Sequence, residues 1–576
     1  CDYFYESHQN EYLKIPGMPI VYWGSDNAIS AFERGKILSL RADLKQGLKT
    51  GDNGRFVRNW HEVKKNSFVI FGGEKWFPYN KGGAYRQWYG NNDSIVNWEN
   101  DGEEIKNFRD DRGKLRSRPQ NLTFMKKEGL TYTDISSTYF GIRWSPKGFL
   151  FDATGSMIFF QNNQDLKYGL GFLASCVATN YTEYFSPTLH FEVGEVSRLP
   201  FLDSEKYKNS VIENVNQNIE IAKHDWDAYE TSWDFIRHPL ISVIAGNSML
   251  FDDVSNIDLA ECYMLWKQEN EERFIQLKSN EEELNRIFID IYGLQDELTS
   301  VVEEKDITVH RIYDTKNDVP ESMQGSPYVR TMRDEITSLL SYIVGCMFGR
   351  YSLSTEGLAY AGGEWDETKY SNFLPDEDNV IPITDHKYMD DDIVERLCEF
   401  LKIVYGEKSL ETNLDFIANA LGGKGATSRE VIRNYFLNDF FKDHCKTYQK
   451  RPIYWLFDSG KQNGFKALVY MHRWDKNSIG RVLVYLHKIQ EKYEIEVRAI
   501  DAMLEHMTDK RQQAVEEQRR DHLLKQIAEI KEYDESLDHM TNEHIDIDLD
   551  DGVKVNYEKV QTDRNGTQFK ILAPIK

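Results

Sequence analysis

The segment spanning residues 47–102 interleaves cations, amides and aromatic side chains with glycines. Arginine and lysine can contact phosphates or the acceptor edge of guanine, and asparagine can read adenine. This mixture is typical of a DNA-reading surface, although clusters of Gly, Asn and Asp also mark turns in any β-rich domain. The candidate DNA contacts in this segment are Lys49, Thr50, Asn53, Arg55, Arg58, Lys81, Arg86 and Tyr89.

A second basic stretch follows at residues 112–118, where a solvated surface turn is as good an interpretation as a phosphate contact. Its candidate contacts are Arg112, Lys114, Arg116 and Arg118. Trp60, Trp88 and Trp98 could stack on bases. In a β-rich domain, however, aromatic residues more often belong to the core, and we expect that role for all three.

The charge of the chain is unevenly distributed. The formal net charge is −24, and residues 201–400 alone contribute −25. Residues 41–150, in contrast, carry +7. Binding to DNA depends on the local potential within a Debye length of about 8–10 Å, so the acidic average does not exclude a nucleic-acid partner.

The sequence lacks the motifs of several catalytic centres. It has no Pro-Pro dipeptide, so it cannot form the [Asn/Asp]-Pro-Pro-[Tyr/Phe] loop that holds the amine of a flipped base. Pro375-Asp-Glu-Asp378 has no Glu-x-Lys within the next 150 residues, and the acidic run at residues 546–552 has the wrong spacing for a calcium loop. No His-Glu-x-x-His occurs. We therefore predict no catalytic, cofactor-binding or metal-binding residue in this chain.

Cysteine usage and hydropathy bear on the compartment. The six cysteines show no Cys-x-x-Cys spacing, so neither a disulfide framework nor a zinc site is indicated. No apolar run approaches the ~20 residues of a membrane span, and the first residues lack the pattern of a signal peptide. These features predict a cytoplasmic protein without membrane association.

The pattern of elements predicts an α+β multidomain protein. Short aromatic and β-branched runs at 67–71, 95–98 and 148–151 indicate strands, and helical periodicity covers 28–46 and 166–184. A capping box at Thr427 and Glu430 predicts a helix start, so the Gly-rich loop before it is expected to be a helix-entry loop. The predicted domains are a mixed α/β domain at 1–200, an acidic helical spacer at 201–327, a helical domain with a Gly/Asp-rich loop at 328–450, and a C-terminal domain with a helical hairpin at 451–576.

Ten sequence strings spread along the chain carry a resemblance to a known family. They are Lys14-Ile-Pro-Gly-Met-Pro-Ile-Val-Tyr-Trp23, Thr50-Gly-Asp-Asn-Gly-Arg-Phe-Val-Arg58, Trp76-Phe-Pro-Tyr-Asn-Lys-Gly-Gly-Ala-Tyr-Arg-Gln-Trp-Tyr-Gly-Asn91, Asn97-Trp-Glu-Asn-Asp-Gly102, Gly129-Leu-Thr-Tyr-Thr133, Pro187-Thr-Leu-His-Phe-Glu-Val-Gly194, Gly349-Arg-Tyr-Ser-Leu353, Arg451-Pro-Ile-Tyr-Trp-Leu-Phe457, Lys466-Ala-Leu-Val-Tyr-Met-His-Arg473 and Asp548-Leu-Asp-Asp-Gly-Val-Lys-Val-Asn-Tyr557. Together these strings resemble the PglX adenine-specific DNA methyltransferases of BREX phage-defence systems, relatives of the type IIG restriction-modification enzymes.

The resemblance implies that the chain corresponds to the C-terminal half of that family. This half would contain the target-recognition domain, helical spacers and a C-terminal helical domain, with double-stranded DNA as its partner and other defence-system proteins as further candidate partners. The family transfers a methyl group from S-adenosylmethionine to the 6-amino group of adenine. The family's N-terminal methyltransferase domain has no match here, so S-adenosylmethionine is expected in the missing half and no cofactor in this chain.

Two other functions remain open. The acidic helices at 201–310 and the hairpin at 480–540 could instead make the chain a protein-interaction scaffold of the defence complex. A divergent nuclease centre in residues 350–400 would require metal-dependent cleavage that is lost on substitution of Asp376 or Asp378.

Overall fold

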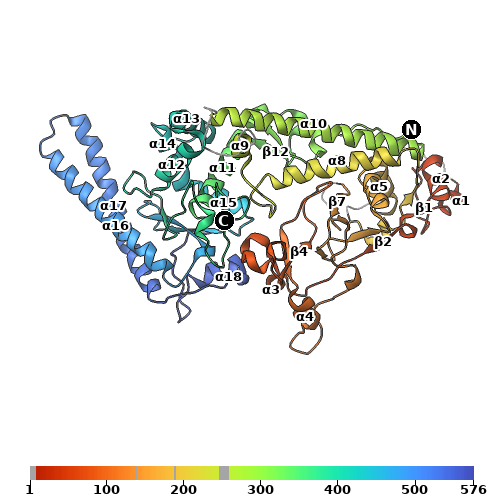
Figure 1. The fold of residues 1–576 in the computed structure, drawn as a ribbon, viewed down its shortest axis with the longest axis horizontal. Coiled ribbons are helices and arrows are strands. Elements are labelled where there is room, and N and C mark those ends of the chain that lie inside the picture. The colour runs from red at the N-terminus through yellow and green to blue at the C-terminus, as the bar shows by residue number, and fades with distance from the viewer. Residues whose placement is uncertain (1–7, 136–138, 187–189, 246–257, 576) are drawn as a thin grey trace. The chain divides into compact units, whose positions relative to one another are not determined.

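The computed structural model describes residues 8–135, 139–186, 190–245 and 258–575. The chain forms two compact units (Figure 1). The first unit comprises Cys1–Trp60, Ser67–Ser232 and Lys267–Thr331, and the second comprises His61–Asn66, Trp233–Trp266 and Met332–Lys576. Both combine helices with small sheets, which confirms the predicted α+β multidomain class. The division into four domains stays a prediction.

Two four-stranded sheets organise the first unit. In spatial order, the strands of the antiparallel sheet are β2 (Ala42–Lys45), β9 (Met157–Phe160), β6 (Gly129–Tyr132) and β7 (Ile142–Ser145). Those of the mixed sheet are β3 (Val57–Asn59), β5 (Ser94–Asn97), β4 (Trp76–Asn80) and β8 (Leu150–Phe151). Two-stranded pairs join β1 (Lys36–Ile37) to β10 (Pro200–Phe201) and β11 (Arg311–Tyr313) to β12 (Val329–Thr331).

Three helices of this unit begin at side-chain caps. Ser25, Asn162 and Ser175 each accept a backbone N–H through the side chain at a helix start. The helices include α1 (Gln9–Tyr12), α2 (Asp26–Arg34), α3 (Asn53–Phe56), α4 (Glu99–Asn107), α5 (Asn163–Leu173), α6 (Cys176–Phe185), α7 (Val193–Val196), α8 (Lys208–Asp227) and most of α10 (Leu259–Tyr292).

Three local predictions need correction. The helix expected over 28–46 ends at Arg34, because Gly35 leaves the helical conformation and β1 and β2 follow. The periodicity over 166–184 belongs to two helices, which Ser175 separates by capping the second. The run at 67–71 is no strand: it contains a 3₁₀ turn at Val69–Phe71 that ends at left-handed Gly72.

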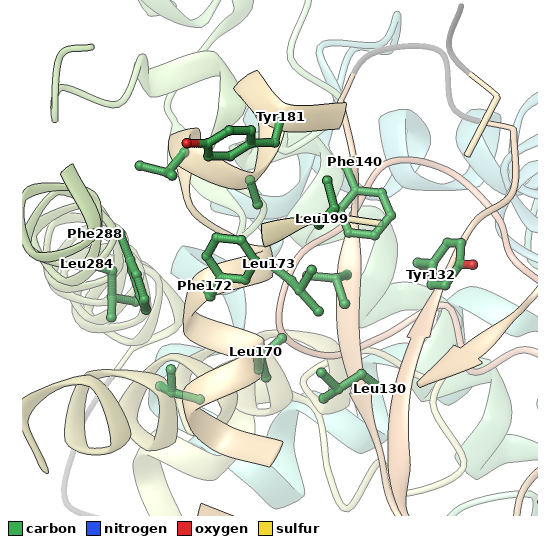
Figure 2. Close-up of a cluster of buried hydrophobic side chains, with 14 of the residues drawn as sticks. Leu130, Tyr132, Phe140, Leu170, Phe172, Leu173, Tyr181, Leu199, Leu284 and Phe288 are labelled. Atoms are coloured by element: carbon green, nitrogen blue, oxygen red, sulfur yellow. The ribbon is translucent and has the colours of Figure 1, made fainter. Parts of the chain in front are cut away.

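The core of the first unit lies where α5 packs between the antiparallel sheet and α10. Figure 2 shows Phe172 of α5 facing Phe288 of α10 on one side, with Leu130 of β6 on the other. The rings of Phe172 and Tyr292 stack with centroids 5.5 Å apart. Gly171 permits close approach of α8, since a Cβ there would lie 2.7 Å from the nearest Val211 side-chain atom. Each fully buried large apolar side chain contributes roughly 1.5–3 kcal/mol.

The second unit surrounds a three-stranded antiparallel sheet, β13–β15–β14, with helices. Its strands are β13 (Ile381–Pro382), β15 (Lys466–Tyr470) and β14 (Tyr454–Asp458). Its helices include α9 (Pro239–Ala245), α11 (Met332–Met347), α12 (Ile393–Tyr405), α13 (Leu410–Leu421), α14 (Ser428–Asn438), α15 (Phe440–Thr447), α16 (Ser478–Leu504), α17 (Lys510–Thr541) and α18 (Gly552–Lys559).

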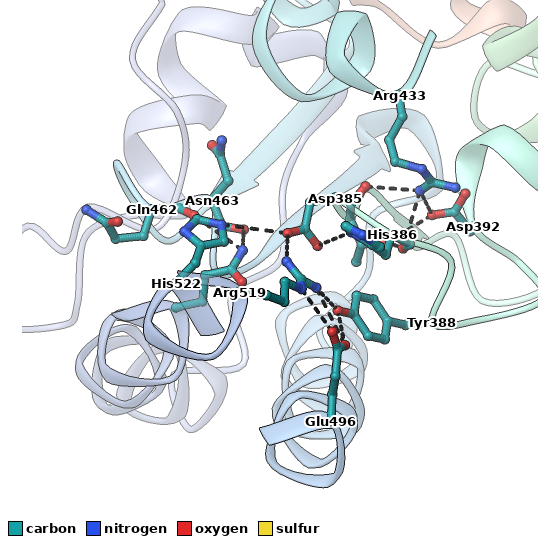
Figure 3. Close-up of polar contacts among 12 residues, drawn as sticks. Asp385, His386, Tyr388, Asp392, Arg433, Gln462, Asn463, Glu496, Arg519 and His522 are labelled. Atoms are coloured by element: carbon teal, nitrogen blue, oxygen red, sulfur yellow. Dashed lines mark hydrogen bonds and ion pairs between the residues drawn. The ribbon is translucent and has the colours of Figure 1, made fainter. Parts of the chain in front are cut away.

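The predicted helical hairpin is confirmed as α16 and α17. Arg519 of α17 ties the hairpin to the loop after β13 (Figure 3): its guanidinium donates to Asp385 at 2.7 Å and to Glu496 of α16 at 2.9 Å. A parallel contact joins Arg433 to Asp392 at 2.6 Å. Both arginines are largely buried, so these charge-assisted bonds are shielded from solvent screening.

Two buried histidines of the second unit are held in the neutral form. His444 accepts the backbone N–H groups of Ile453 and Tyr454 at 3.0 and 3.1 Å, and His472 lies 3.2 Å from the carbonyl oxygen of Val63. Burial, reinforced by the Arg350 guanidinium, lowers the pKa of each imidazole to about 3. An ordinary unfolded-state histidine has a pKa near 6.5, so the unfolded chain binds more protons between pH 3 and pH 6.5.

We therefore expect the free energy of unfolding to fall as the pH drops from 6.5 towards 4. His472→Gln keeps a nitrogen for Val63 but cannot titrate, so its stability should decline less steeply, by up to about 1.4 kcal/mol per pH unit. Urea unfolding at several pH values measures this. His506→Gln, at an exposed histidine, is the control and should keep the wild-type slope. An unchanged slope in His472→Gln would contradict the assignment.

Candidate nucleic-acid interface

The structure brings the two predicted basic segments side by side in the first unit. Lys49 and Arg118 form an antiparallel backbone bridge, with N–H to oxygen distances of 3.1 and 2.8 Å. Two residues on, Gly51 adopts a φ of +81°, and a Cβ there would lie 2.8 Å from the carbonyl carbon of Arg116. Residues 47–58 and 109–118 therefore form one continuous element.

This element presents cations to solvent. We call six of its exposed cations the basic surface, namely Lys49, Arg55, Arg112, Lys114, Arg116 and Arg118. The seventh, Arg109, donates to a backbone carbonyl within the element. Among the described residues, only Arg55 of these six has an ion pair, with Glu104 of α4 (Nε to Oε1, 2.8 Å). Figure 1 shows α3, which carries Arg55, next to α4. Residues 47–58 and 109–118 carry eight lysines and arginines against three aspartates, so this element creates a local positive potential.

An aromatic platform supports part of the basic surface. The guanidinium carbons of Arg55 and Arg116 lie 5.2 and 5.1 Å from the centroid of Phe108, within the range of cation–π attraction. Phe108 packs edge-on against fully buried Phe56, with centroids 5.1 Å apart. Through Phe108, the two arginines are anchored to the core of the unit. Both remain exposed to solvent.

The second basic stretch is an ordered turn. The Asp110 carboxylate accepts the backbone N–H groups of Arg112 and Lys114 at 3.0 and 2.8 Å, and Arg109 donates to the carbonyl of Gly113 at 2.9 Å. The backbone N–H of Arg116 donates to Phe108 at 2.9 Å. These bonds fix the backbone while the side chains of Arg112 and Lys114 project into solvent.

Thr50 and Asn53 flank the basic surface. Buried Thr50 donates its hydroxyl to Oδ1 of exposed Asn53 at 2.8 Å. This bond occupies the amide oxygen and leaves the amide nitrogen as the outward donor. Asp52 caps α3 by accepting the N–H of Arg55 at 3.1 Å.

Three of the predicted contact residues lie inside the first unit and away from solvent. Arg58 is 9% exposed and donates to the carbonyls of Gly54 and Val57. Arg86 is 6% exposed, and Tyr89 is 3% exposed in the main core. Lys81 is half-buried, 3.9 Å from Asp152. The structure does not bring these side chains to the basic surface, so it favours structural roles for them.

Arg86 belongs to a buried charge cluster. It lies 3.5 Å from Asp225 and 4.9 Å from the ring centroids of both Trp226 and Tyr328. His310 donates its backbone N–H to the same carboxylate at 2.9 Å. Burial opposes ionisation of Asp225, but His310 and Arg86 outweigh it and hold its pKa below the usual range. Arg86 therefore balances a carboxylate inside the protein.

Three tryptophans of residues 47–102 and two further lysines also differ in their surroundings. Trp60, Trp88 and Trp98 are all buried, which confirms their predicted core role. Sequence reasoning did not single out Lys45 and Lys127 as a pair of neighbouring cations. Their amino groups each lie 4.8 Å from the ring centroid of Phe124. The Lys126-Lys127 pair was a visible signal for the second of these. The contact through Phe124, in contrast, arises only in the folded chain.

The Gly-rich loop before α14 is a helix-entry loop, as predicted. Thr427 caps the helix, and the Glu430 carboxylate accepts the N–H of Ala426 at 2.7 Å. Arg429 is committed to Glu411 through two bonds of 2.7 Å. Carboxylates thus take up the polar groups around this loop, and they disfavour a phosphate there.

The acidic stretch at residues 376–378 forms a backbone turn. Asp376 and Asp378 both accept the N–H of Val380, at 3.0 and 3.2 Å. Burial and the neighbouring Asp378 raise the pKa of Asp376 to about 7. Across the described ranges of the chain, no group of three or more His, Cys, Asp or Glu side chains is arranged to hold a metal ion. The structure thus adds no support to the nuclease hypothesis.

The string at residues 187–194 is described only in part. Its residues 187–189 lie outside the described residues, and its end enters α7 after a capping box at Glu192. Within the part of the chain that the structure describes, no helix is both long and apolar enough to cross a bilayer.

The sequence of this chain is similar to those of two known proteins. No protein-family model matches the chain. The adenine-specific methyltransferase PglX of Lacticaseibacillus casei (strain Zhang) is 42% identical over 592 residues, which cover 100% of this chain and 46% of the relative. The adenine-specific methyltransferase BrxX of Escherichia coli O9:H4 (strain HS) is 36% identical over 579 residues, covering 96% of this chain and 45% of the relative.

The fold and the site define a multidomain α+β protein with an exposed cationic surface on one compact unit. The chain is a homologue, over nearly all of its length, of the adenine-specific methyltransferases PglX and BrxX. It spans slightly less than half the length of these two relatives.

The buried position of Arg86 leads to a test. Arg86→Ala leaves the buried Asp225 carboxylate without its guanidinium partner, so we expect a loss of roughly 2–4 kcal/mol in the free energy of unfolding. Arg116→Ala, on the surface, should change it by less than about 0.5 kcal/mol. Urea unfolding followed by tryptophan fluorescence measures both. If Arg86→Ala were as stable as the wild type yet lost DNA binding, Arg86 would be a DNA contact after all.

Proposed function

We propose that this chain is the DNA-binding and target-recognition part of a site-specific adenine DNA methyltransferase in a BREX phage-defence or restriction-modification system, and that it corresponds to the C-terminal half of such an enzyme. The observation that carries the proposal is the basic surface, five of whose six cations have no ion pair among the described residues, in a homologue of adenine-specific methyltransferases. The enzyme would act in the cytoplasm on double-stranded DNA.

The energetics of base flipping give such a part its role. Extruding an adenine from the duplex costs a few kcal/mol of unstacking and unpairing, which contacts elsewhere must offset. Each phosphate that a lysine or arginine neutralises releases condensed counterions and strengthens binding. The basic surface supplies these contacts, while Asn53 and the outer arginines supply groups that can reach base edges.

The charge distribution supports one defined contact face. Residues 41–150 carry +7, against −25 for residues 201–400. The acidic residues 201–400 repel phosphates, which disfavours nonspecific binding through that part of the chain.

Methyl transfer itself is assigned to no residue of this chain. The amine-holding loop requires a Pro-Pro dipeptide that the sequence lacks. The sheets of the described residues have two to four strands and are mostly antiparallel. The methyl donor and its chemistry would belong to the portion of the enzyme that the relatives possess beyond the aligned region.

The proposal predicts salt-sensitive duplex binding by this chain. Combined replacement of Lys49, Arg116 and Arg118 by alanine should weaken binding to all duplex sequences, and it should lower the slope of log affinity against log salt by roughly 2–3, at about 0.9 per phosphate contact. Fluorescence anisotropy between low and moderate salt measures both quantities.

Lys36→Ala serves as the matched control, because Lys36 is an exposed cation of β1 in the same unit. This variant should bind as the wild type does. Equal affinity and an equal salt slope for the triple variant and the wild type would overturn the assignment of the basic surface.

A second candidate function, a protein-interaction scaffold, draws support from the hairpin. Ile495, Met503 and Val515 are large apolar residues of α16 and α17 that are 47%, 47% and 61% exposed. A complex with another defence-system protein that persists at high salt and without DNA would favour the scaffold over DNA recognition.

A further inference from the structure

The first unit contains a cavity of about 260 Å³ that the proposed DNA contact does not use. None of its lining residues belongs to the basic surface. Its walls come from the loop at residues 85–88, the start of α6, one side of α10 and the loop at residues 301–306. The volume is that of roughly eight or nine water molecules at about 30 Å³ each, enough for a short alkyl chain with a polar head.

One carboxyl group of the cavity wall is only half satisfied. Glu281 of α10 accepts a hydrogen bond from Trp88 Nε1 to its Oε1 at 2.7 Å. Within the described residues its Oε2 has no hydrogen-bond partner. The neighbouring Asn285 is fully engaged, because its Oδ1 accepts the N–H of Cys176 at 2.8 Å and its Nδ2 donates to Ser300 at 3.2 Å. Glu281 therefore has an acceptor oxygen to spare on this wall.

The charges that line the cavity are all negative. Glu303 and Asp306 accompany Glu281, and no lysine, arginine or histidine lines the wall. Lys305, which lies between Glu303 and Asp306 in sequence, is exposed and bonded to Glu303 at 2.6 Å. Burial raises the pKa of Glu281 to about 8, with Asp306 and Glu282 adding to the effect. Burial likewise raises the pKa of Asp306.

The remaining titratable groups add no positive charge. Burial raises the pKa of the Cys176 thiol to about 12 and that of the Tyr85 hydroxyl well above its usual value, so both are neutral at neutral pH. Glu282 is engaged with Lys278 at 2.7 Å. A ligand that brings a positive charge would therefore remove the electrostatic cost of ionising Glu281.

The other walls suit the apolar body of such a ligand. The rings of Tyr85 and Tyr139 meet edge to face with centroids 5.9 Å apart, and Trp88 lies beside Glu281. Aromatic faces attract cations, and Leu284, Val301 and Val302 offer aliphatic contact. An anion or a phosphate group is disfavoured, because the described residues of this wall offer it carboxyl groups and no cation.

We propose that this cavity binds a primary alkylammonium group, with the ammonium at Glu281 and the alkyl chain along the aromatic and aliphatic walls. The group belongs either to a small free amine or to a lysine side chain. The site is independent of the DNA-binding proposal, and it holds whether or not the basic surface contacts DNA.

The first test is calorimetry of this chain with n-butylammonium chloride, compared with n-butanol, which has a similar shape and no charge. We expect butylammonium to bind at least tenfold more tightly. Its binding should be several-fold tighter at pH 8.5 than at pH 7, with proton release, because Glu281 must ionise. N-acetyl-lysine methylamide forms a second arm: comparable binding by it points to a lysine side chain, and binding by butylammonium alone points to a free amine.

Two variants and one control make the test specific. Glu281→Gln keeps an oxygen for Trp88 but cannot ionise, so it should lose the preference for butylammonium over butanol. Asp306→Asn should weaken butylammonium binding and serves if Glu281→Gln is poorly folded. Glu283→Gln, at a residue of the same helix bonded to Arg286, should bind as the wild type does. Equal binding of butanol and butylammonium by the wild type, or undiminished preference in Glu281→Gln, would overturn the proposal.

Discussion

The backbone bridge between Lys49 and Arg118 is the constraint on which the basic surface depends. It joins two stretches that are about 60 residues apart in sequence, and it requires the close approach that Gly51 provides beside Arg116. A side chain at Gly51 would meet backbone atoms at 2.8–2.9 Å and would strain a φ of +81°. The positive potential is therefore a product of tertiary pairing, and each stretch alone presents only part of it.

Burial decides what a cation does in this protein. Arg86, Arg433 and Arg519 are buried or nearly so, and each lies against carboxylates inside its own unit. Lys49, Arg112 and Arg116 are exposed and have no ion pair in the described part of the chain. The first group stabilises packing, because removing one partner leaves a charge without compensation. The second group stays available to a polyanion, although the chain as a whole is strongly acidic.

Features that depend on local sequence could be predicted, whereas features that depend on distant contacts could not. Periodicity predicted the hairpin of α16 and α17, and capping chemistry predicted the start of α14, since both signals are local. The two basic stretches were also visible in sequence. Composition could not separate Arg116 on the surface from Arg86 in the core, however, because that difference depends on Asp225, more than 130 residues further along the chain. The cavity at Glu281 was invisible for the same reason.

The most direct test of the central claim is photocrosslinking of this chain to duplex DNA that carries 5-iododeoxyuridine, with the attached peptides identified by mass spectrometry. The account predicts crosslinks within residues 47–58 and 109–118, lost in competition with unlabelled duplex and diminished at moderate salt. Crosslinks confined to the hairpin of α16 and α17, or none at low salt, would contradict the assignment of the basic surface as the DNA-contacting face.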